Sequence, residues 1–270
     1  MPPALTPSLQ PDVLFINRNW TDCAFWHNLL GSLFGKHTEN RTLGEEASRL
    51  AMRNMGWLAN QPDWLKEELL ACSRLRQFSR GQYAYHFEDG PGGMYGVANG
   101  SFGVLVPSGG EMIMCHVMGP GAWFGWGPIL TGGQRSLSFR AVEESRALYV
   151  SLSDLGTIGA RNPDLYRLLG ALGEASMNAM TARAVGDLLI PSCERRIAAV
   201  LARLGSEATG KPPATLRLAQ SVLGQMSNAS RVRVNRALRE FESAGWVSVR
   251  YQSIRVTDVA SLEAFARREA

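Results

Sequence analysis

Residues 218–247 read LAQSVLGQMSNASRVRVNRALREFESAGWV, and this stretch decides the fold of the C-terminal part of the chain. Leu218–Met226 has the apolar spacing of a short helix, a Ser-Asn-Ala turn follows, and Ser230–Ala244 has the spacing of a second helix. Two short β runs come next, around Val247–Arg250 and Ile254–Val256. This order predicts a helix-turn-helix followed by a β-hairpin.

The second of these helices carries basic and polar side chains on its outer side. Val234, Leu238 and Phe241 supply its apolar face, and Ser230 is suited to cap its first turn. The positive N-terminal end of such a helix can meet a phosphate, and in the major groove Arg can bond to guanine and Asn to adenine. The residues expected to contact DNA are Ser230, Arg231, Val232, Arg233, Asn235, Arg236 and Arg239.

The positive charge of the chain is concentrated in the same region. The 270 residues carry a formal net charge of +4, yet 13 of the 28 Lys and Arg and only 7 of the 24 Asp and Glu lie in residues 191–270. This segment is therefore +6, and residues 1–190 are −2. Such asymmetry favours a nucleic-acid or membrane-surface partner. A solvated helix face whose arginines pair with Glu240 and Glu242 is the alternative, and the helix-turn-helix context favours DNA.

The central part of the chain has the pattern of an antiparallel sheet. Short apolar runs separated by Gly- and Pro-rich turns predict strands near Gln82–Phe87, Phe102–Val106, Met112–Met118, Ser136–Val142 and Ala147–Ser151. Asn54–Glu67 is expected to be a helical approach to them. Residues 1–50 receive no function, although their aromatic residues would suit a short helix packed on the next domain.

A long helix is predicted after Asn162-Pro163, which suit its cap and first position. Apolar or small residues then recur with alternating steps of four and three, which makes a heptad seam. The seam consists of Leu168, Leu172, Ala175, Ala179, Ala182, Gly186 and Leu189. A second copy of the helix in a two-fold dimer would cover this seam, and burial within the helix's own domain would cover it equally well.

Several classes of protein and site are excluded. No run of residues is long and apolar enough to span a membrane, and residues 1–7 lack a secretory pattern, so a cytoplasmic protein is expected. The cysteines and histidines form no spacing typical of a metal or redox site. They are Cys23, Cys72, Cys115, Cys193, His27, His37, His86 and His116.

The order of these parts resembles the Crp-Fnr family of bacterial transcription regulators over residues 54–260. The C-terminal pattern is carried by Gln220, Gly224, Ser230-Arg231, Val234, Arg236, Leu238, Glu242 and Gly245. The pattern of the family's cyclic-nucleotide-binding roll is carried by Gly81, Tyr95, Gly100, Gly119, Gly121, Phe124-Gly125 and Arg135-Ser136.

The resemblance implies an α+β fold with an N-terminal antiparallel β-roll, a long dimerisation helix and a C-terminal winged helix-turn-helix. The implied divisions are an extension of unknown role (1–53), a sensor roll (54–161), the dimerisation helix (162–190) and the DNA-binding domain (191–270). It also implies a homodimer without enzymatic activity that binds a palindromic site in double-stranded DNA and works with RNA polymerase.

The sequence departs from the family where cyclic AMP binds. In responsive members a Glu bonds to the ribose and an Arg-Ser pair holds the phosphate. Here Trp126 replaces that Glu, and Ala182 replaces a Ser beside Thr181, while Arg135-Ser136 are retained. Trp cannot accept a hydrogen bond, so cyclic AMP is not expected to bind tightly. The candidate effector pocket consists of Trp123, Phe124, Gly125, Trp126, Arg135, Ser136 and Thr181.

Three alternatives for this region remain open. An aromatic pocket could bind an apolar or aromatic effector, a nucleotide could be held by Arg135 alone, or the same aromatic rings could fill the core without any ligand. The rings concerned are Tyr83, Tyr85, Trp123, Trp126 and Phe139. The last of these alternatives would make a ligand-independent DNA-binding regulator. A cupin-like enzyme is a more remote alternative, because it needs a convergent His and Glu metal set that the sequence lacks. In the recognition helix Val232 stands where many members carry Glu, which predicts an altered half-site.

Overall fold

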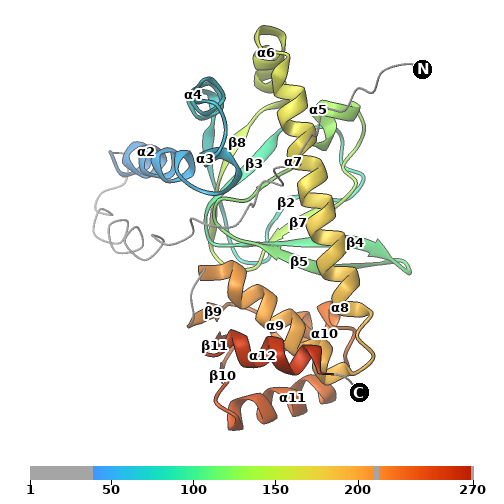
Figure 1. The fold of residues 1–270 in the computed structure, drawn as a ribbon. Helices are drawn as coiled ribbons and strands as arrows, with labels where there is room; N and C mark the ends of the chain where they lie inside the picture. The colour runs from blue at the N-terminus through green and yellow to red at the C-terminus, as the bar shows by residue number, and fades with distance from the viewer. Residues whose placement is uncertain (1–38, 210–212, 269–270) are drawn as a thin grey trace, which may run out of the picture.

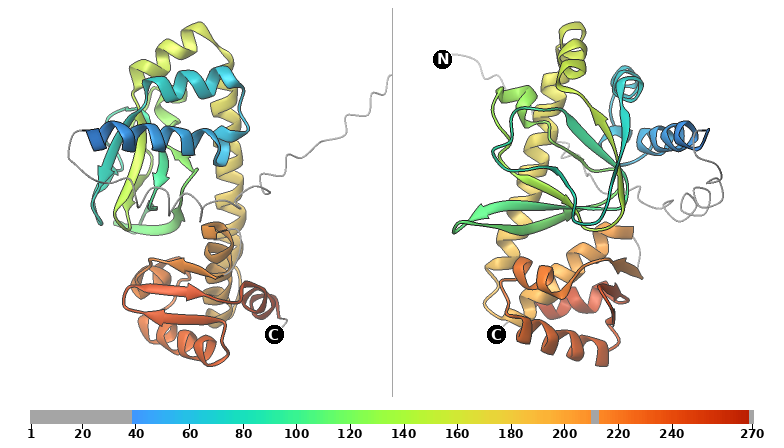
Figure 2. Two further views of the ribbon diagram at one scale, coloured as in Figure 1. Left: turned by 90° about the vertical axis from the view of Figure 1, so that its left-hand side faces the viewer. Right: turned by 180° about the vertical axis from the view of Figure 1, so that it is seen from behind.

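The computed structural model describes residues 39–209 and 213–268. A β-roll with helices on its outer side forms one end of the molecule, and a smaller helical module forms the other (Figure 1). A long helix runs beside the roll and leads into the small module (Figure 2). The expected α+β architecture, with a roll and a C-terminal winged helix-turn-helix, is confirmed.

The roll consists of two antiparallel four-stranded sheets, with orders β1-β8-β3-β6 and β2-β7-β4-β5. Their bounds are β1 Arg74–Phe78, β2 Tyr83–Tyr85, β3 Met94–Asn99, β4 Phe102–Ser108, β5 Glu111–Met118, β6 Trp123–Phe124, β7 Ser138–Ala141 and β8 Ser145–Val150. The predicted runs overlap five of these strands and miss β1, β3 and β6. Strand β3 is buried on both faces, so it lacks the alternation by which a half-exposed strand is recognised.

Helices cover the outer side of the first sheet. They are α2 Glu39–Arg53, α3 Gly56–Ala59, α4 Asp63–Cys72 and α6 Leu152–Arg161, while α5 Gly127–Thr131 follows strand β6. Helix α2 lies within the predicted extension and buries Ala51 and Met52 against the sheet. Residues 1–38 of that extension lie outside the described residues.

The roll has two hydrophobic clusters, and strand β6 contributes one side chain to each. Trp123 packs with Met52 and Leu58 under the helices, whereas Phe124 packs with Phe102 and Phe139 between the sheets. Neighbouring residues on a strand point to opposite faces, which explains this division.

The long helix consists of α7 Asp164–Met180, a π-helical segment η1 Thr181–Val185 and α8 Gly186–Leu188. Leu165, Leu169 and Leu172 of α7 are buried against the roll. Farther along, the helix leaves large apolar side chains in solvent: Met177 is 55% exposed, Val185 48%, Leu188 47% and Leu189 76%.

The C-terminal module is a winged helix with a three-stranded antiparallel sheet of order β10-β11-β9. Its elements are α9 Cys193–Thr209, β9 Ala214–Leu216, α10 Gln220–Met226, α11 Arg231–Ser243, β10 Val247–Arg250, β11 Ser253–Val256 and α12 Val259–Arg267. Val234, Leu238 and Phe241 form the inner face of α11, as expected from their spacing, and they pack with Leu201 of α9.

Polar contacts join the module to the roll. Arg203 of α9 forms an ion pair with Asp187 at 2.8 Å and lies 3.0 Å from the Nδ1 atom of His116 on β5. Arg217 forms an ion pair with Glu143 at 3.1 Å. These contacts join the C-terminal module to the roll beside strand β5 (Figure 1). Within residues 39–209 and 213–268, no helix has both the length and the apolarity to cross a membrane.

Candidate nucleic-acid interface

The turn between α10 and α11 is tight because a glycine lies beneath it. The amide of Ala229 donates to the carbonyl of Gly224 at 2.8 Å, and a Cβ atom on Gly224 would come within 2.8 Å of the Ala229 oxygen. Asn228 has a positive φ of 47°, a conformation that Asn tolerates better than most residues. Ser227 is buried and donates its hydroxyl to the carbonyl of Leu223. The turn therefore sets the angle at which α11 leaves α10.

Helix α11 begins as the sequence predicts. Ser230 is its N-cap and accepts a hydrogen bond from the amide of Arg233 at 3.4 Å. The predicted DNA-contacting residues lie on the exposed side or at the first turn: Ser230, Arg231, Val232, Arg233, Arg236 and Arg239 are exposed, and Asn235 is half-buried. Val232 is 76% exposed, which is unusual for an apolar side chain and leaves it available to a thymine methyl group.

The arginines of α11 differ in their partners. Arg236 forms an ion pair with Glu240 at 3.1 Å, and Arg239 donates to the carbonyl of Asn235. Arg231 has no ion pair among the residues that the structure describes. Glu242 instead accepts a hydrogen bond from the amide of Val249 on β10. It therefore contacts the β10–β11 hairpin, the wing of the winged helix, and pairs with no arginine among the described residues. These exposed contacts are weak and can be exchanged for contacts to DNA.

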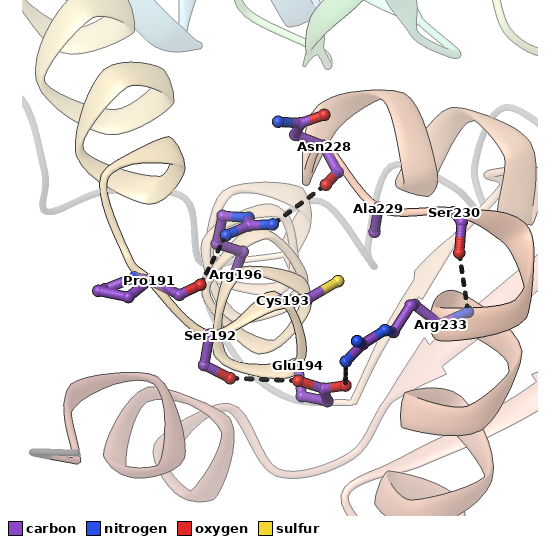
Figure 3. A pocket seen from close by; sticks show the side chains of 9 residues that line it. All are labelled: Pro191, Ser192, Cys193, Glu194, Arg196, Asn228, Ala229, Ser230 and Arg233. Carbon is purple, nitrogen blue, oxygen red and sulfur yellow. Dashed lines mark hydrogen bonds and ion pairs between the residues drawn. The ribbon is translucent and has the colours of Figure 1, made fainter.

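A polar pocket of about 510 Å³ lies beside the start of α11 (Figure 3). The N-terminal ends of α9 and α11 and the turn before α11 form its walls. Glu194 of α9 reaches across it and forms an ion pair with Arg233 at 2.8 Å, while the hydroxyl of Ser192 donates to the other carboxylate oxygen at 3.2 Å. The hydrogen bond from Arg233 lowers the pKa of Glu194, and the same contact raises the pKa of Arg233.

Arg196 lies in the same pocket and connects the long helix to the recognition turn. Its guanidinium donates to the carbonyls of Ile190 and Pro191 at 2.9 and 3.0 Å, and to those of Ser227 and Asn228 at 2.8 and 3.1 Å. Sequence reasoning missed both Arg196 and Glu194. The contacts of Arg196 with Ser227 and Asn228, and of Glu194 with Arg233, span 31 to 39 residues of the chain, so no local pattern indicates them.

In the roll, Arg135 is buried and its donors are used by the protein itself. Its Nη1 atom donates to the carbonyl of Gly125 at 2.7 Å and its Nη2 atom to that of Gly93 at 2.6 Å. The guanidinium carbon lies 4.0 Å from the centre of the Tyr85 ring. Tyr85 was expected only as a ring of an aromatic pocket or of the core, and Gly93 was not predicted at all, because a backbone carbonyl leaves no motif in the sequence.

The rings expected around Arg135 pack on each other. Phe124 stacks on Phe139 with ring centres 4.2 Å apart. Tyr95 also stacks on Phe124, with ring centres 5.2 Å apart. Burial raises the pKa of both Tyr85 and Tyr95. The alternative in which aromatic rings fill the core therefore fits this part of the roll.

The predicted effector residues lie in separate places. Phe124, Gly125 and Arg135 lie together, whereas Trp123 points under the helices, where its Nε1 atom has no hydrogen-bond partner among the described residues. Trp126 packs against α7, where a Cβ atom on Gly173 would come within 2.9 Å of the indole. Ser136 and Thr181 are exposed.

The predicted helix seam is also divided. Leu172 is buried and Leu168 half-buried against the roll of the same chain, whereas Gly186 and Leu189 are exposed. Ala175 and Ala179 are half-buried, and the side chain of Ala182 lies outside what the structure describes. The π-helical segment changes the turn angle between the two halves, so one straight seam does not continue through it. No group of His, Cys, Asp and Glu in the described part of the chain could hold a metal ion.

Comparison with known proteins places both parts of the chain. Residues 195–265 match the Crp-like helix-turn-helix domain, and residues 75–162 match the cyclic nucleotide-binding domain. A CRP-like cAMP-activated global transcriptional regulator of Mycobacterium tuberculosis is 30% identical over 170 residues, which cover 61% of this chain and 75% of that protein.

A second M. tuberculosis protein, the HTH-type transcriptional regulator Cmr, is 24% identical over 235 residues, or 84% of this chain and 93% of that protein. Among solved structures, FixK2 from Bradyrhizobium japonicum superposes with a TM-score of 0.62 at 16% identity, covering 73% of this chain and 99% of that chain. This last similarity concerns the fold.

Proposed function

The chain belongs to the Crp-Fnr family of transcription regulators, and we propose that it acts as a cytoplasmic homodimer that binds a two-fold symmetric DNA site without control by cyclic AMP. One α11 helix would occupy the major groove of each half-site. The protein would regulate transcription together with RNA polymerase and would catalyse no reaction.

The observation that carries the DNA-binding proposal is the exposed basic side of a capped helix. Arg231, Arg236 and Arg239 lie on it in solvent, and their contacts are local or absent among the described residues. Val232 replaces the carboxylate that could accept a bond from cytosine, so we expect a half-site with an A·T pair at that position.

The dimer is supported by the apolar stripe at the lower half of the long helix. Met177, Val185, Leu188 and Leu189 are about half exposed or more, although they are large apolar side chains on one helix. Large apolar side chains exposed on one helix mark a candidate interaction surface, and a second copy of the same helix would cover them. The upper half of the predicted seam already packs on the roll, so we propose that the interface centres on these four residues.

The residues present do not fit a cyclic nucleotide. The guanidinium that would hold the phosphate is bound to two backbone carbonyls and covered by Tyr85. Trp126 replaces the ribose-binding carboxylate and fills the space against Gly173 of α7. Binding would have to break buried charge-assisted hydrogen bonds and displace an indole, which supports a roll that works without this ligand.

The test is selection of binding sites from a random-sequence duplex pool, followed by band-shift titration of Arg236→Ala. We expect the enriched sites to be inverted repeats whose half-sites are about 10 base pairs apart. Arg236→Ala should weaken binding to them by about 1–3 kcal/mol, and cyclic AMP should change the affinity less than the ~5-fold of a typical effector.

Arg267→Ala is the matched control, because Arg267 also pairs with a glutamate one helical turn away but lies on α12. Wild-type affinity in Arg236→Ala would contradict the role of α11. Enrichment of a single asymmetric site would contradict the dimer, and a large gain in affinity with cyclic AMP would contradict the proposal for the roll.

A further inference from the structure

The carboxylate of Glu194 occupies a place that suits an anion. It lies in the pocket where α9 and α11 both begin, and the caps of these two helices, Ser192 and Ser230, face the same space (Figure 3). A helix N-terminus carries a partial positive charge, and Arg233 adds a full one. A negative group in this position is therefore stabilised from several sides.

A DNA backbone phosphate would be stabilised by the same groups. Helix N-termini and arginines are the usual phosphate contacts of DNA-binding helices. Arg233 lies at the first turn of α11, the end of the helix that would enter the groove. A phosphate that approaches this end meets an arginine whose partner is already the carboxylate of Glu194.

We propose that Glu194 is an internal competitor for the DNA phosphate at Arg233. In the free protein Glu194 holds the Arg233 side chain, and a phosphate contact forms only when Arg233 leaves it. Glu194 thereby lowers the affinity for DNA of any sequence and reduces the salt dependence of binding. This inference rests on the proposed binding of DNA by α11.

The exchange is feasible because Arg233 is the more exposed member of the pair. Its side chain is 57% exposed and has one contact to Glu194, whereas the Glu194 side chain is 21% exposed and also accepts from Ser192. Arg196 differs, because its donors are bound to four backbone carbonyls, two just after the long helix and two in the turn before α11. Arg233 is therefore the arginine of this pocket that can turn toward DNA.

The competition has a defined consequence for recognition. A phosphate contact is the same for every sequence, so its loss weakens binding uniformly. Stable complexes then depend more on the base contacts that Val232, Arg236 and their neighbours can make.

The experiment measures binding of a mixed-sequence duplex of about 30 base pairs, long enough for roughly three helical turns, by fluorescence anisotropy at several salt concentrations. The full-length variant Glu194→Gln keeps the shape of the side chain and removes its charge. We expect about 3–10-fold tighter binding at low salt, and a slope of log K against log salt that is steeper by up to about 0.9, equivalent to one additional phosphate. The gain should disappear in Glu194→Gln/Arg233→Gln.

Glu263→Gln is the control, because Glu263 lies in the same module, pairs with Arg267 on α12 and changes the net charge equally. An equal gain in this control, or a gain that survives the Arg233→Gln substitution, would overturn the inference, as would an unchanged slope in Glu194→Gln. If wild-type protein binds no duplex even at low salt, the proposed DNA binding fails and the inference fails with it. If the wild-type protein binds the duplex but Glu194→Gln has the same slope of log K against log salt, the inference fails and the proposed DNA binding stands.

Discussion

Arg135 in the roll and Arg233 at the start of α11 both have hydrogen-bond partners within the chain, but they differ in burial and in the kind of partner. Arg135 is 5% exposed, and backbone carbonyls and the ring of Tyr85 bind it. Arg233 is more than half exposed, and a side-chain carboxylate binds it. A carbonyl of a strand or a tight loop cannot move away without breaking the fold, whereas a surface carboxylate can exchange its partner.

The two arginines indicate where each half of the molecule can bind a further molecule. The roll satisfies its buried charge within the chain, and leaving such a group unpaired would cost several times more than losing a surface pair. In the winged helix, the arginines of α11 have weak exposed contacts that water, salt or a phosphate can replace, whereas Arg196 and Arg203 of α9 are bound within the chain. The buried charge of the roll therefore stabilises its fold, whereas the exposed arginines of α11 can exchange their partners for a phosphate.

The largest expected effects concern the hydrophobic cores, because the roll and the winged helix would not be independent if they shared one cooperative core. Phe124 and Phe241 are each 1% exposed, and they belong to different hydrophobic clusters. Each substitution, Phe124→Ala or Phe241→Ala, should cost about 3–5 kcal/mol of unfolding free energy in its own half. Differential scanning calorimetry should show that each lowers the transition of one half.

Tyr251→Ala is the control for this pair, because the ring is 91% exposed at the tip of the wing. Its effect should stay within about 0.5 kcal/mol. If both phenylalanine variants shift one common transition by the same amount, the halves unfold together and the contrast between them does not hold.

The internal bonding of Arg135 predicts an effect of intermediate size. Arg135→Met would keep much of the buried volume but leave the carbonyls of Gly93 and Gly125 without a donor, and each unsatisfied buried acceptor costs about 1–3 kcal/mol. We expect a loss of this size in the roll, measured by denaturant unfolding, with unchanged affinity for the selected DNA site.

Arg140→Met is the matched variant for this measurement. Arg140 also lies over a tyrosine, with its guanidinium 5.6 Å from the ring centre of Tyr83, but it is only half-buried. It should cost less than about 1 kcal/mol. Equal stability of Arg135→Met and wild type would show that Arg135 is not a structural group.

The sequence was most informative where a contact is local. The cap at Ser230 and the inner face of α11 follow from spacing and residue type alone. The long helix also begins near the predicted place, but its N-cap is Pro163 and not Asn162, whose side chain donates to Glu68 instead of capping the helix. Strand alternation could also have separated Trp123 from Phe124, although the sequence analysis placed both in one pocket.

Contacts between distant segments were not predictable in this way. Glu194 and Arg233 are 39 residues apart, and Arg135 and Gly93 are 42 apart. Which arginine binds DNA and which binds the backbone depends on the packing of the chain, since the residue type is the same. The π-helical segment of the long helix likewise interrupts a heptad pattern that is regular in the sequence.

The smallest expected effect is a difference between the halves in alkaline solution. Burial raises the pKa of Tyr85 and Tyr95 in the folded roll above the ordinary value of about 10, so their stabilising effect is complete below that pH. As the pH rises further, the unfolded chain loses phenolic protons that the folded roll retains, and stability falls by up to about 1.4 kcal/mol per pH unit for each tyrosine.

Residues 191–270 contain a single tyrosine, the exposed Tyr251, so the winged helix should lose less. Calorimetry should therefore show that the transition temperature of the roll falls more than that of the winged helix between about pH 9 and pH 11. Tyr85→Phe should reduce this fall, and Tyr251→Phe should not. An equal alkaline shift in both halves would mean that the buried phenols of the roll do not distinguish it from the recognition module.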